Sequence, residues 1–338
     1  MGDNLRKVVL LGDVNVDLLM NIPAYPPKGG DALVLDVETR AGGSLANTAI
    51  VLSRLQLATE IITHTGFDPW ADIALQTLRA EGVGIKFLKQ DQRAGTGLIF
   101  ITVTPDGERT MFSYRGANVL VEAGEISHDT LAGAGLLHLS DYSFMKSPQK
   151  DAAWRAIELA EALGIPITLD LGVAPAAVLG HDLERLLGKL DLLVLGDQEA
   201  ITISHKDQLD SALDYLLACG VKTIGLKLGK EGCMVVSGQE RVRLPGFDVK
   251  TIDTTGAGDA FSAAMIFGQM LGLKLPVRGL LGNTLGALTT TVRGAGASLQ
   301  PIEFVRTFLG QQKTGSPDWD HLVDEALNAL DFNADLRE

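Results

Sequence analysis

The sequence predicts an α/β protein in which a mainly parallel β-sheet lies between two layers of helices. The first observation is that short, continuous apolar runs alternate with amphipathic helical patterns through most of the 338 residues. The second is that two segments in the N-terminal third break this alternation and have a strand pattern of their own. A chain of this length can bury a sizeable core. None of its apolar runs approaches the roughly 18 residues that a membrane-spanning helix needs.

The apolar runs are typical of strands that are buried on both faces. They cover residues 7–12, 60–66, 136–142, 167–171, 190–196 and 223–229. Helical patterns lie between them at residues 44–56, 68–82 and 147–164. The last pattern has Ser147 in front, a proline in its first turn and Gly164 at its end, which are start and stop signals of a helix. Strands that alternate with helices in this way favour a parallel sheet.

The two segments that break the pattern predict a small β layer. Residues 31–43 alternate between apolar and polar, and residues 97–116 indicate a hairpin that turns at Pro105-Asp106-Gly107. We expect a β lid from about 13–43 and 95–118 that projects from the main sheet, although an edge extension of that sheet would give the same pattern. Residues 311–338 follow a Gly-Ser-Pro break and predict an acidic helical tail behind a domain of residues 1–310.

Charge and cysteine content exclude several classes of protein. The formal net charge of −13 disfavours binding to nucleic acid. Cys219 and Cys233 are too few and too far apart for a disulfide framework or a cysteine-based metal site. The N-terminus enters an apolar run without the features of a signal peptide. We therefore expect a cytoplasmic protein without membrane association.

The stretch "DTTGAGDAF" at residues 253–261 carries the strongest chemical signal. Gly256, Ala257 and Gly258 precede or open a helical pattern at 256–271, where unpartnered backbone N–H groups form an anion site. Asp259 follows directly, and a carboxylate beside a developing anion can take a proton from an attacking hydroxyl group. Phosphoryl transfer needs both functions. The simpler alternative is an acid that stabilises the first turn of its helix.

Polar residues after the first strand suggest where an acceptor substrate binds. Asn15 and Asp17 follow the apolar run at 7–12, and ligands bind at the carboxyl ends of parallel strands. An amide and a carboxylate at this spacing suit neighbouring sugar hydroxyls, and a plain turn is the alternative. The sequence has no complete P-loop, no Gly-x-Gly-x-x-Gly after the first strand, no His-Glu-x-x-His and no Gly-x-Ser-x-Gly.

Four sequence motifs occur along the chain in the same order as in a known protein family. "GDVNVD" (12–17), "AGGSLANTA" (41–49), "KLGKEG" (227–232) and "DTTGAGDAF" make the chain similar to the pfkB, or ribokinase, family of carbohydrate and nucleoside kinases over residues 7 to about 310. The resemblance implies a ribokinase-like three-layer α/β/α sandwich with a β lid. It also implies ATP-dependent transfer of the γ-phosphate to a primary hydroxyl of a small, ribose-like sugar. Fructose, 2-keto-3-deoxygluconate and nucleosides are alternative substrates, and a non-catalytic sugar- or nucleotide-binding regulator is an alternative of another class.

The resemblance assigns roles to individual residues. Asp259 would be the base, and Gly256, Ala257 and Gly258 would form the anion hole. Sugar contacts would come from Asn15, Asp17, Gly42, Gly43, Asn47 and Asp141. Nucleotide and Mg²⁺ contacts would come from Lys227, Gly229, Gly232, Asn283 and Glu199. A monovalent cation, K⁺, would lie beside Asp253, Thr255, Thr289, Val292, Gly294 and Ser298.

Several of these assignments have simpler alternatives. Lys227 would otherwise be a solvated strand-end lysine, Asn283 a partner in a hydrogen bond within the protein, and Glu199 an acid in the first turn of a helix. The family commonly has Asn three positions before this glutamate, whereas this chain has Gly196. The lid would select the substrate through Phe112, Tyr114, Arg115 and Asn118, with Arg115 either binding a sugar-acid carboxylate or solvated. We also expect a homodimer formed through the lid.

Overall fold

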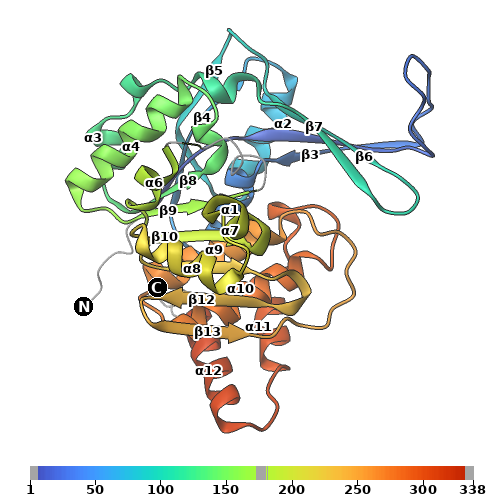
Figure 1. The fold of residues 1–338 in the computed structure, drawn as a ribbon. Helices are drawn as coiled ribbons and strands as arrows, with labels where there is room; N and C mark the ends of the chain where they lie inside the picture. Colours follow the sequence, from blue (N-terminus) through green and yellow to red (C-terminus); the bar gives the residue numbers. More distant parts are fainter. Residues whose placement is uncertain (1–6, 173–179, 181, 332–338) are drawn as a thin grey trace.

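A central sheet forms the middle layer of the molecule (Figure 1). The computed structural model describes residues 7–172, 180 and 182–331. In this part of the chain the sheet has nine strands in the order β13-β12-β11-β10-β9-β8-β1-β4-β5, and it is parallel except at β12 and β13. The strands are β1 (Lys7–Leu11), β4 (Thr59–Gly66), β5 (Gly84–Asp91), β8 (Ala134–Ser140), β9 (Ile167–Asp170), β10 (Leu192–Gly196), β11 (Ile224–Lys227), β12 (Cys233–Ser237) and β13 (Glu240–Leu244). All six predicted strands are confirmed.

Helices cover both faces of this sheet because successive strand residues point to opposite sides. Val8 and Leu10 pack into one core and Val9 and Leu11 into the other. The first core contains residues of α1 (Ser44–Arg54), α2 (Pro69–Ala80), α9 (Ala257–Met270), α10 (Leu275–Thr289), α11 (Ile302–Gly310) and α12 (Pro317–Asp331). The second contains residues of α3 (His128–Leu131), α4 (Gln149–Leu163), α6 (Asp182–Leu187), α7 (Asp197–Ser204) and α8 (Leu209–Ala218). The predicted three-layer sandwich is therefore confirmed.

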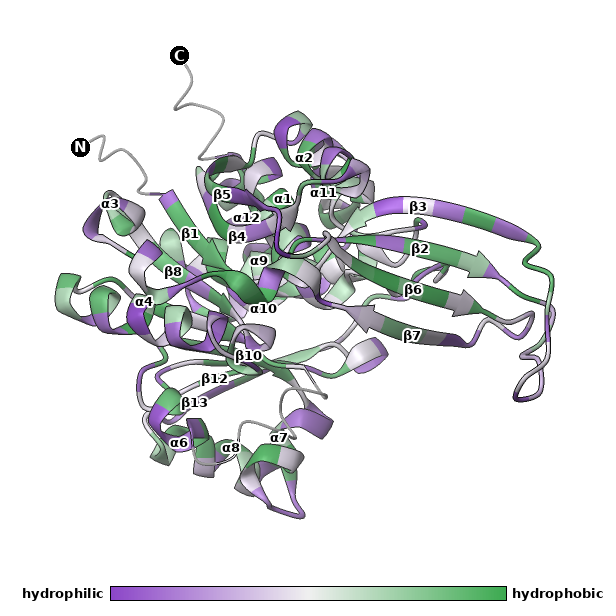
Figure 2. Cartoon of the chain, turned by 90° about the horizontal axis from the view of Figure 1, so that it is seen from above, coloured by the Kyte–Doolittle hydropathy of each residue, from purple (hydrophilic) through white to green (hydrophobic). Residues whose placement is uncertain are grey.

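A second, separate sheet projects from the body and is called the lid sheet below (Figures 1 and 2). Its four strands lie in the order β3-β2-β6-β7, with bounds β3 (Asp36–Gly42), β2 (Asn15–Asn21), β6 (Gly97–Val103) and β7 (Arg109–Tyr114). The predicted hairpin at 97–116 is present as β6 and β7. The lid sheet is not an extension of the central sheet. Asn15 and Asp17, expected directly after the first strand, lie within β2.

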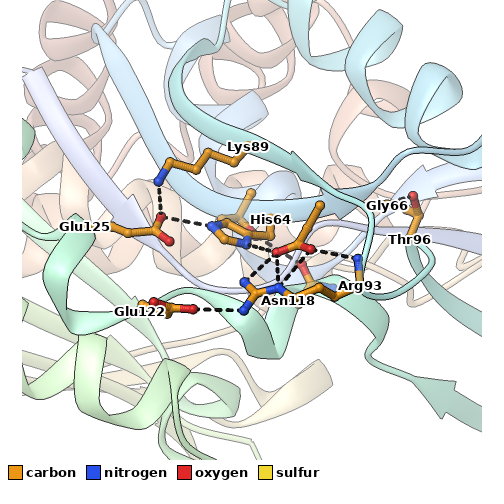
Figure 3. Close-up of polar contacts among 10 residues, drawn as sticks. His64, Gly66, Lys89, Arg93, Thr96, Asn118, Glu122 and Glu125 are labelled. Atoms are coloured by element: carbon orange, nitrogen blue, oxygen red, sulfur yellow. Dashed lines mark hydrogen bonds and ion pairs between the residues drawn. The ribbon is translucent and has the colours of Figure 1, made fainter.

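A polar network holds the segment that leads into β6 (Figure 3). The buried His64 on β4 contacts Asp91 at the end of β5 at 3.3 Å and Glu125 at 2.9 Å. Arg93 forms ion pairs with the carboxylates of Asp91 and Glu122. These contacts tie the root of the lid sheet to the central sheet.

The C-terminal segment forms part of the body. In α12, Val323 and Ala326 are fully buried in the same core as α10. Residues 332–338 of the predicted tail lie outside the described residues. No helix in the described ranges has the length and apolar character needed to cross a bilayer.

Candidate active site

The N-terminus of α9 is built to receive an anion. Gly256 precedes the helix in a left-handed conformation with φ of 76°, and a Cβ atom there would come within 2.4 Å of the Ala295 side chain. Glycine is therefore required at this turn. Ala257 donates a weak 3.3 Å hydrogen bond to the Thr254 carbonyl. Within the described residues, the N–H of Gly258 donates to no protein acceptor. Free N–H groups and the helix dipole favour an anion at this turn, which is called the anion hole below.

Asp259 is fixed in the first turn of α9 by the start of α1. The Ser44 hydroxyl donates to Asp259 Oδ1 at 2.6 Å, and the Asn47 amide donates to Oδ2 at 2.7 Å. Burial, and after it the negative charge of Asp170, raises the pKa of Asp259 to about 6. The two hydrogen bonds and the positive charge of Lys227 lower this pKa, but by less. A carboxylate with this pKa is ionised at neutral pH and is basic enough to accept a proton. Asn47, predicted to contact sugar, thus also positions this carboxylate.

Lys227 lies beside the anion hole and is not a solvated lysine. Its Nζ forms an ion pair of 2.8 Å with Asp170 Oδ1, and Ser262 donates to Asp170 Oδ2 at 2.8 Å. The Nζ would be 3.4 Å from a Cβ atom on Gly258. Burial lowers the pKa of Lys227, but the charge and hydrogen bond of Asp170 raise it above its usual value overall, so Lys227 stays protonated. Asp170 was not predicted as a site residue.

A cavity of about 510 Å³ opens next to the anion hole. Four of the residues predicted to bind nucleotide line it together with Ala257 and Gly258: Lys227, Gly229, Gly232 and Asn283. Its remaining walls include residues that the sequence analysis missed, among them Phe247, Val249, Thr251, Phe261 and Thr290. The volume and the largely apolar walls suit a nucleotide-sized ligand.

Asn283 has a partner inside the protein as well as a place in the cavity wall. Its amide donates to the Pro245 carbonyl at 2.9 Å and so fixes the loop after β13. Phe247 of the same loop packs edge to face on Phe308 with ring centroids 5.3 Å apart. In the sequence, the Pro-Gly pair at residues 245–246 predicts a turn at this point, but it does not predict that the loop forms a wall of the cavity.

Glu199 does not line the cavity itself, but it lies near Lys227, which does: its charge raises the pKa of Lys227, and Gly196 pairs with Lys227 in the sheet. Glu199 is in the first turn of α7, and a Cβ atom on Gly196 would lie 2.4 Å from its Oε2. The Glu199 side chain therefore occupies the space that an asparagine at position 196 would need. In the described ranges no three His, Cys, Asp or Glu residues cluster as metal ligands. A Mg²⁺ ion held mainly by phosphate and water oxygens, with one or two carboxylates, fits this arrangement.

Asn15 and Asp17 lie at the root of the lid sheet. The fully buried Asn118 donates to Asn15 Oδ1 at 2.9 Å and accepts a bond of 2.9 Å from the Val14 N–H. Asn118 therefore positions Asn15. Burial and the charge of Asp259 raise the pKa of Asp17 to about 6, although nearby Arg109 and Arg40 lower it. Asp17 also lies near the predicted base, because its carboxyl group packs against Gly42, and Ser44, two residues further on, donates to Asp259.

The remaining predicted sugar residues differ in their surroundings. A Cβ atom on Gly42 would lie 2.4 Å from the Asp17 carboxyl group, and one on Gly43 would lie 2.6 Å from the Asp13 carbonyl. Both glycines therefore allow close packing at the root of the lid. Asp141 is buried and accepts hydrogen bonds from the Tyr142 and Gly172 N–H groups at 2.7 and 2.5 Å. Burial raises the pKa of Asp141 to about 7, and the nearby charge of Asp170 acts in the same direction.

Three of the lid residues predicted to select the substrate have surroundings that differ from the expectation. Strand register puts Phe112 and Tyr114 on the face of the lid sheet opposite to Asp17. Arg115 is neither solvated nor free for a sugar-acid carboxylate, because it donates two hydrogen bonds, of 2.7 and 2.6 Å, to the Asp13 carboxylate.

The residues predicted to bind K⁺ come together around an arginine. Arg109, the first residue of β7, donates to both Asp253 Oδ1 and the Thr255 hydroxyl. Gly294 donates its N–H to Asp253 Oδ2 at 3.0 Å. The side chain of Thr289 instead donates to the Leu285 carbonyl within α10. Ser298 lies close to Gly294, and Val292 lies in the segment between α10 and Gly294.

A parallel α/β sandwich with a β lid, an anion hole at a helix N-terminus and a fixed carboxylate beside it defines a class of phosphoryl-transfer proteins. The model of the pfkB family of carbohydrate kinases matches residues 5–302 of this chain. The chain therefore belongs to the pfkB family of carbohydrate kinases.

Individual relatives agree with this family. The chain is 30% identical to a ribokinase of Staphylococcus aureus (strain COL) over 309 residues, which covers 89% of this chain and 98% of that protein. It is 29% identical to fructokinase-2 of Solanum lycopersicum over 286 residues, which covers 79% of this chain and 86% of the relative. The structure of Arabidopsis thaliana ribokinase complexed with ribose and ATP superimposes with a TM-score of 0.78 at 23% identity, covering 89% and 98% of the two chains. This last similarity is one of fold.

Proposed function

We propose that this protein is an ATP-dependent sugar kinase that phosphorylates a primary hydroxyl group of a small, ribose-like sugar. One observation carries the proposal: the Asp259 carboxylate is held at 2.6 and 2.7 Å by Ser44 and Asn47 directly beside the anion hole. The nucleotide-sized cavity lies next to that hole, and Asp17 lies near the same carboxylate. A donor and an acceptor of phosphate can therefore meet at one point.

The proposed reaction assigns a separate task to each group. Asp259 accepts the proton of the sugar hydroxyl as its oxygen attacks the γ-phosphate. The N–H groups of Gly256, Ala257 and Gly258 stabilise the negative charge on the transferred group, and Lys227 adds a fixed positive charge. Mg²⁺, bound with the nucleotide, would neutralise phosphate charge. Asn15 and Asp17 orient the sugar by hydrogen bonds to its hydroxyls.

Two observations favour a neutral sugar over a sugar acid. Arg115, the lid residue considered for a carboxylate, already forms an ion pair with Asp13 at 2.6 Å. Asn15 and Asp17 at the root of the lid sheet offer an amide and a carboxylate, which suit hydroxyl groups. Similarity to both a ribokinase and a fructokinase supports a pentose or ketohexose acceptor.

Three further expectations belong to this proposal. The kinase domain would comprise residues 1–310, with α12 packed against it. A cytoplasmic location is supported by the two free cysteines, Cys219 and Cys233. A monovalent cation beside Asp253 and Thr255 stays a prediction of the resemblance, and the contacts of Arg109 with both residues argue against it.

We also propose a homodimer formed through the outer face of the lid sheet. Large apolar side chains are half exposed there, including Val37 (57%), Phe112 (57%) and Tyr114 (48%). Figure 2 shows the lid sheet extending away from the body with hydrophobic residues along its strands. Pairing with a second copy would cover this patch. Phe112→Glu should convert the dimer into a monomer in sedimentation-velocity experiments, and a wild-type protein that is monomeric at micromolar concentration would refute this part.

The substrate is tested by measuring ADP release over a panel of acceptors. Pentoses, ketohexoses, sugar acids and nucleosides are compared by kcat/KM with ATP and Mg²⁺. We expect ribose to give the highest value. A higher value for fructose, 2-keto-3-deoxygluconate or a nucleoside would replace ribose with that substrate. Sugar binding without ADP release across the whole panel would instead support a non-catalytic regulator.

A further inference from the structure

An arginine of the lid sheet reaches the loop that leads into the anion hole. Arg109 forms an ion pair of 2.5 Å with Asp253 Oδ1, and the same nitrogen donates to the Thr255 hydroxyl. The two ion-pair partners are largely buried, with exposed side-chain fractions of 21% for Arg109 and 11% for Asp253. A buried ion pair of this kind fixes both of its partners. The contact joins residues that are 144 positions apart in the sequence.

The Asp253 carboxylate accepts three hydrogen bonds besides the one from Arg109. Oδ1 also accepts the Thr255 N–H at 2.9 Å and the Thr255 hydroxyl at 2.6 Å, and Oδ2 accepts the Gly294 N–H at 3.0 Å. Burial would raise the pKa of Asp253, but the bonds from Thr255 and Gly294 and the charge of Arg109 lower it below its usual value. The carboxylate is thus ionised, and its charge is already balanced.

A second arginine of the lid sheet adds positive charge to the same loop. A Cβ atom on Gly294 would lie 2.4 Å from Arg40 Nη1 and 2.7 Å from Ser298 Oγ. Arg40 pairs with Glu38 through its other nitrogens, whereas its Nη1 is buried without an acceptor among the described residues. The region beside Asp253 therefore already holds the charge that a cation would bring.

These residues do not fit the monovalent cation that the family resemblance implies. A monovalent cation bound about 4 Å from the Arg109 guanidinium group would be repelled by its positive charge. This repulsion would lower the affinity of the site for the cation by about a thousandfold. The Thr290 carbonyl, at the end of α10, already accepts the Ile252 and Asp253 N–H groups at 2.7 and 3.2 Å. Asp253 and Thr255 are both occupied by Arg109.

We propose that the Arg109 guanidinium group takes the place of the monovalent cation beside the anion hole, so that catalysis does not depend on K⁺. The inference rests on the proposed kinase activity and concerns how its anion hole is organised. Asp253 and Thr255 lead directly into Gly256 and the first turn of α9. A guanidinium group bound to both residues holds this turn in place and adds a positive field at the phosphate site.

The first test measures the dependence of activity on the cation. ADP release is followed with tetramethylammonium as the sole monovalent cation and again with KCl at the same ionic strength. The wild-type rate should change by less than about twofold. Arg109→Ala should lose about a hundredfold in kcat without K⁺. It should regain much of this loss with K⁺, because the space beside Asp253 is then open. Arg155→Ala, an exposed arginine of α4, is the control and should behave like wild type.

Two results would overturn the proposal. One is a wild-type rate that rises tenfold or more with K⁺ in a saturable way, which would leave the kinase function intact. The other is a folded Arg109→Ala protein that is fully active without K⁺ or inactive with every cation.

A second test does not need activity. Crystals of the wild type and of Arg109→Ala are soaked with Tl⁺, a heavy analogue of K⁺ that is visible by anomalous scattering. We expect a peak beside Asp253 only in the variant. A peak beside Asp253 in the wild type would refute the proposal even if the variant fails to fold.

Discussion

The two sides of the active site are built differently. The nucleotide side lies inside the body, where the cavity walls come from α9, α10 and the loops around β11 to β13. The sugar side depends on the lid sheet, whose outer face is half exposed and which reaches the body through its root and Arg109. In the proposed kinase, a preformed nucleotide site and a projecting sugar site imply that ATP affinity is set by the core and sugar affinity by the position of the lid. Asp259 lies where the two sides meet.

The largest effect is expected at that meeting point. Asp259→Asn keeps the shape of the side chain but removes the base, so kcat should fall by about a thousandfold. Binding of ribose and of ATP, measured by calorimetry, should change little. Asp72→Asn, which alters an exposed acid in the first turn of α2, is the matched control and should keep full activity. Equal loss in both variants would reduce Asp259 to a helix-stabilising acid.

A smaller effect confined to the nucleotide side is expected for Gly258→Ala. The added Cβ atom would lie 3.4 Å from Lys227 Nζ and would obstruct the approach of a phosphate to the anion hole. We expect kcat/KM for ATP to fall by about a hundredfold. Gly310→Ala, where no atom lies within 4 Å of the new Cβ, serves as the control. Unchanged kinetics for Gly258→Ala would place the phosphate elsewhere.

The variant Asp17→Asn tests the sugar side alone. Loss of a charged hydrogen bond costs about 2 kcal/mol, so KM for the sugar should rise by about thirtyfold while KM for ATP stays the same. Asp36→Asn, at the exposed end of β3, should have no effect. A comparable rise in KM for ATP would show that the two sides are not independent.

The pH dependence of kcat/KM tests Asp259 and Asp17 together. Asp259 and Asp17 both have pKa values of about 6, and in the proposed reaction each acts in its ionised form. Protonation below pH 6 therefore removes activity, and kcat/KM should fall by at least about tenfold for each further pH unit. Asp17→Asn should make this acidic limb less steep. A profile that is flat down to pH 5 would contradict the assignment of Asp259 as the base.

Much of the body could be predicted from sequence because buried parallel strands are continuous apolar runs. The strand at Asn15–Asn21 was not recognised, since "NVDLLMN" combines apolar residues with the site residues Asn15 and Asp17. The packing of α12 was also missed. Its acidic composition suggested a tail, whereas Val323 and Ala326, three positions apart, form a buried stripe.

The local motif at 253–261 predicted the turn and the helix start that the structure has there, with Asp259 in the first turn of α9. Asp170 could not be predicted, because a single acid at the end of a strand also suits a turn. Its partners Lys227 and Ser262 are 57 and 92 positions away in the sequence. The contact of Arg109 with Asp253 likewise depends on how the lid sheet folds over the body. Such long-range pairs follow from tertiary structure and leave no local pattern.

The most direct measurement is a crystal structure of the protein with ribose and a non-hydrolysable ATP analogue. We predict the γ-phosphate on the N–H groups of residues 256–258. The primary hydroxyl of the sugar should lie within hydrogen-bonding distance of Asp259, about 2.6–3.2 Å. A γ-phosphate bound away from the start of α9, or a sugar whose hydroxyls all lie out of reach of Asp259, would contradict the proposed catalytic arrangement.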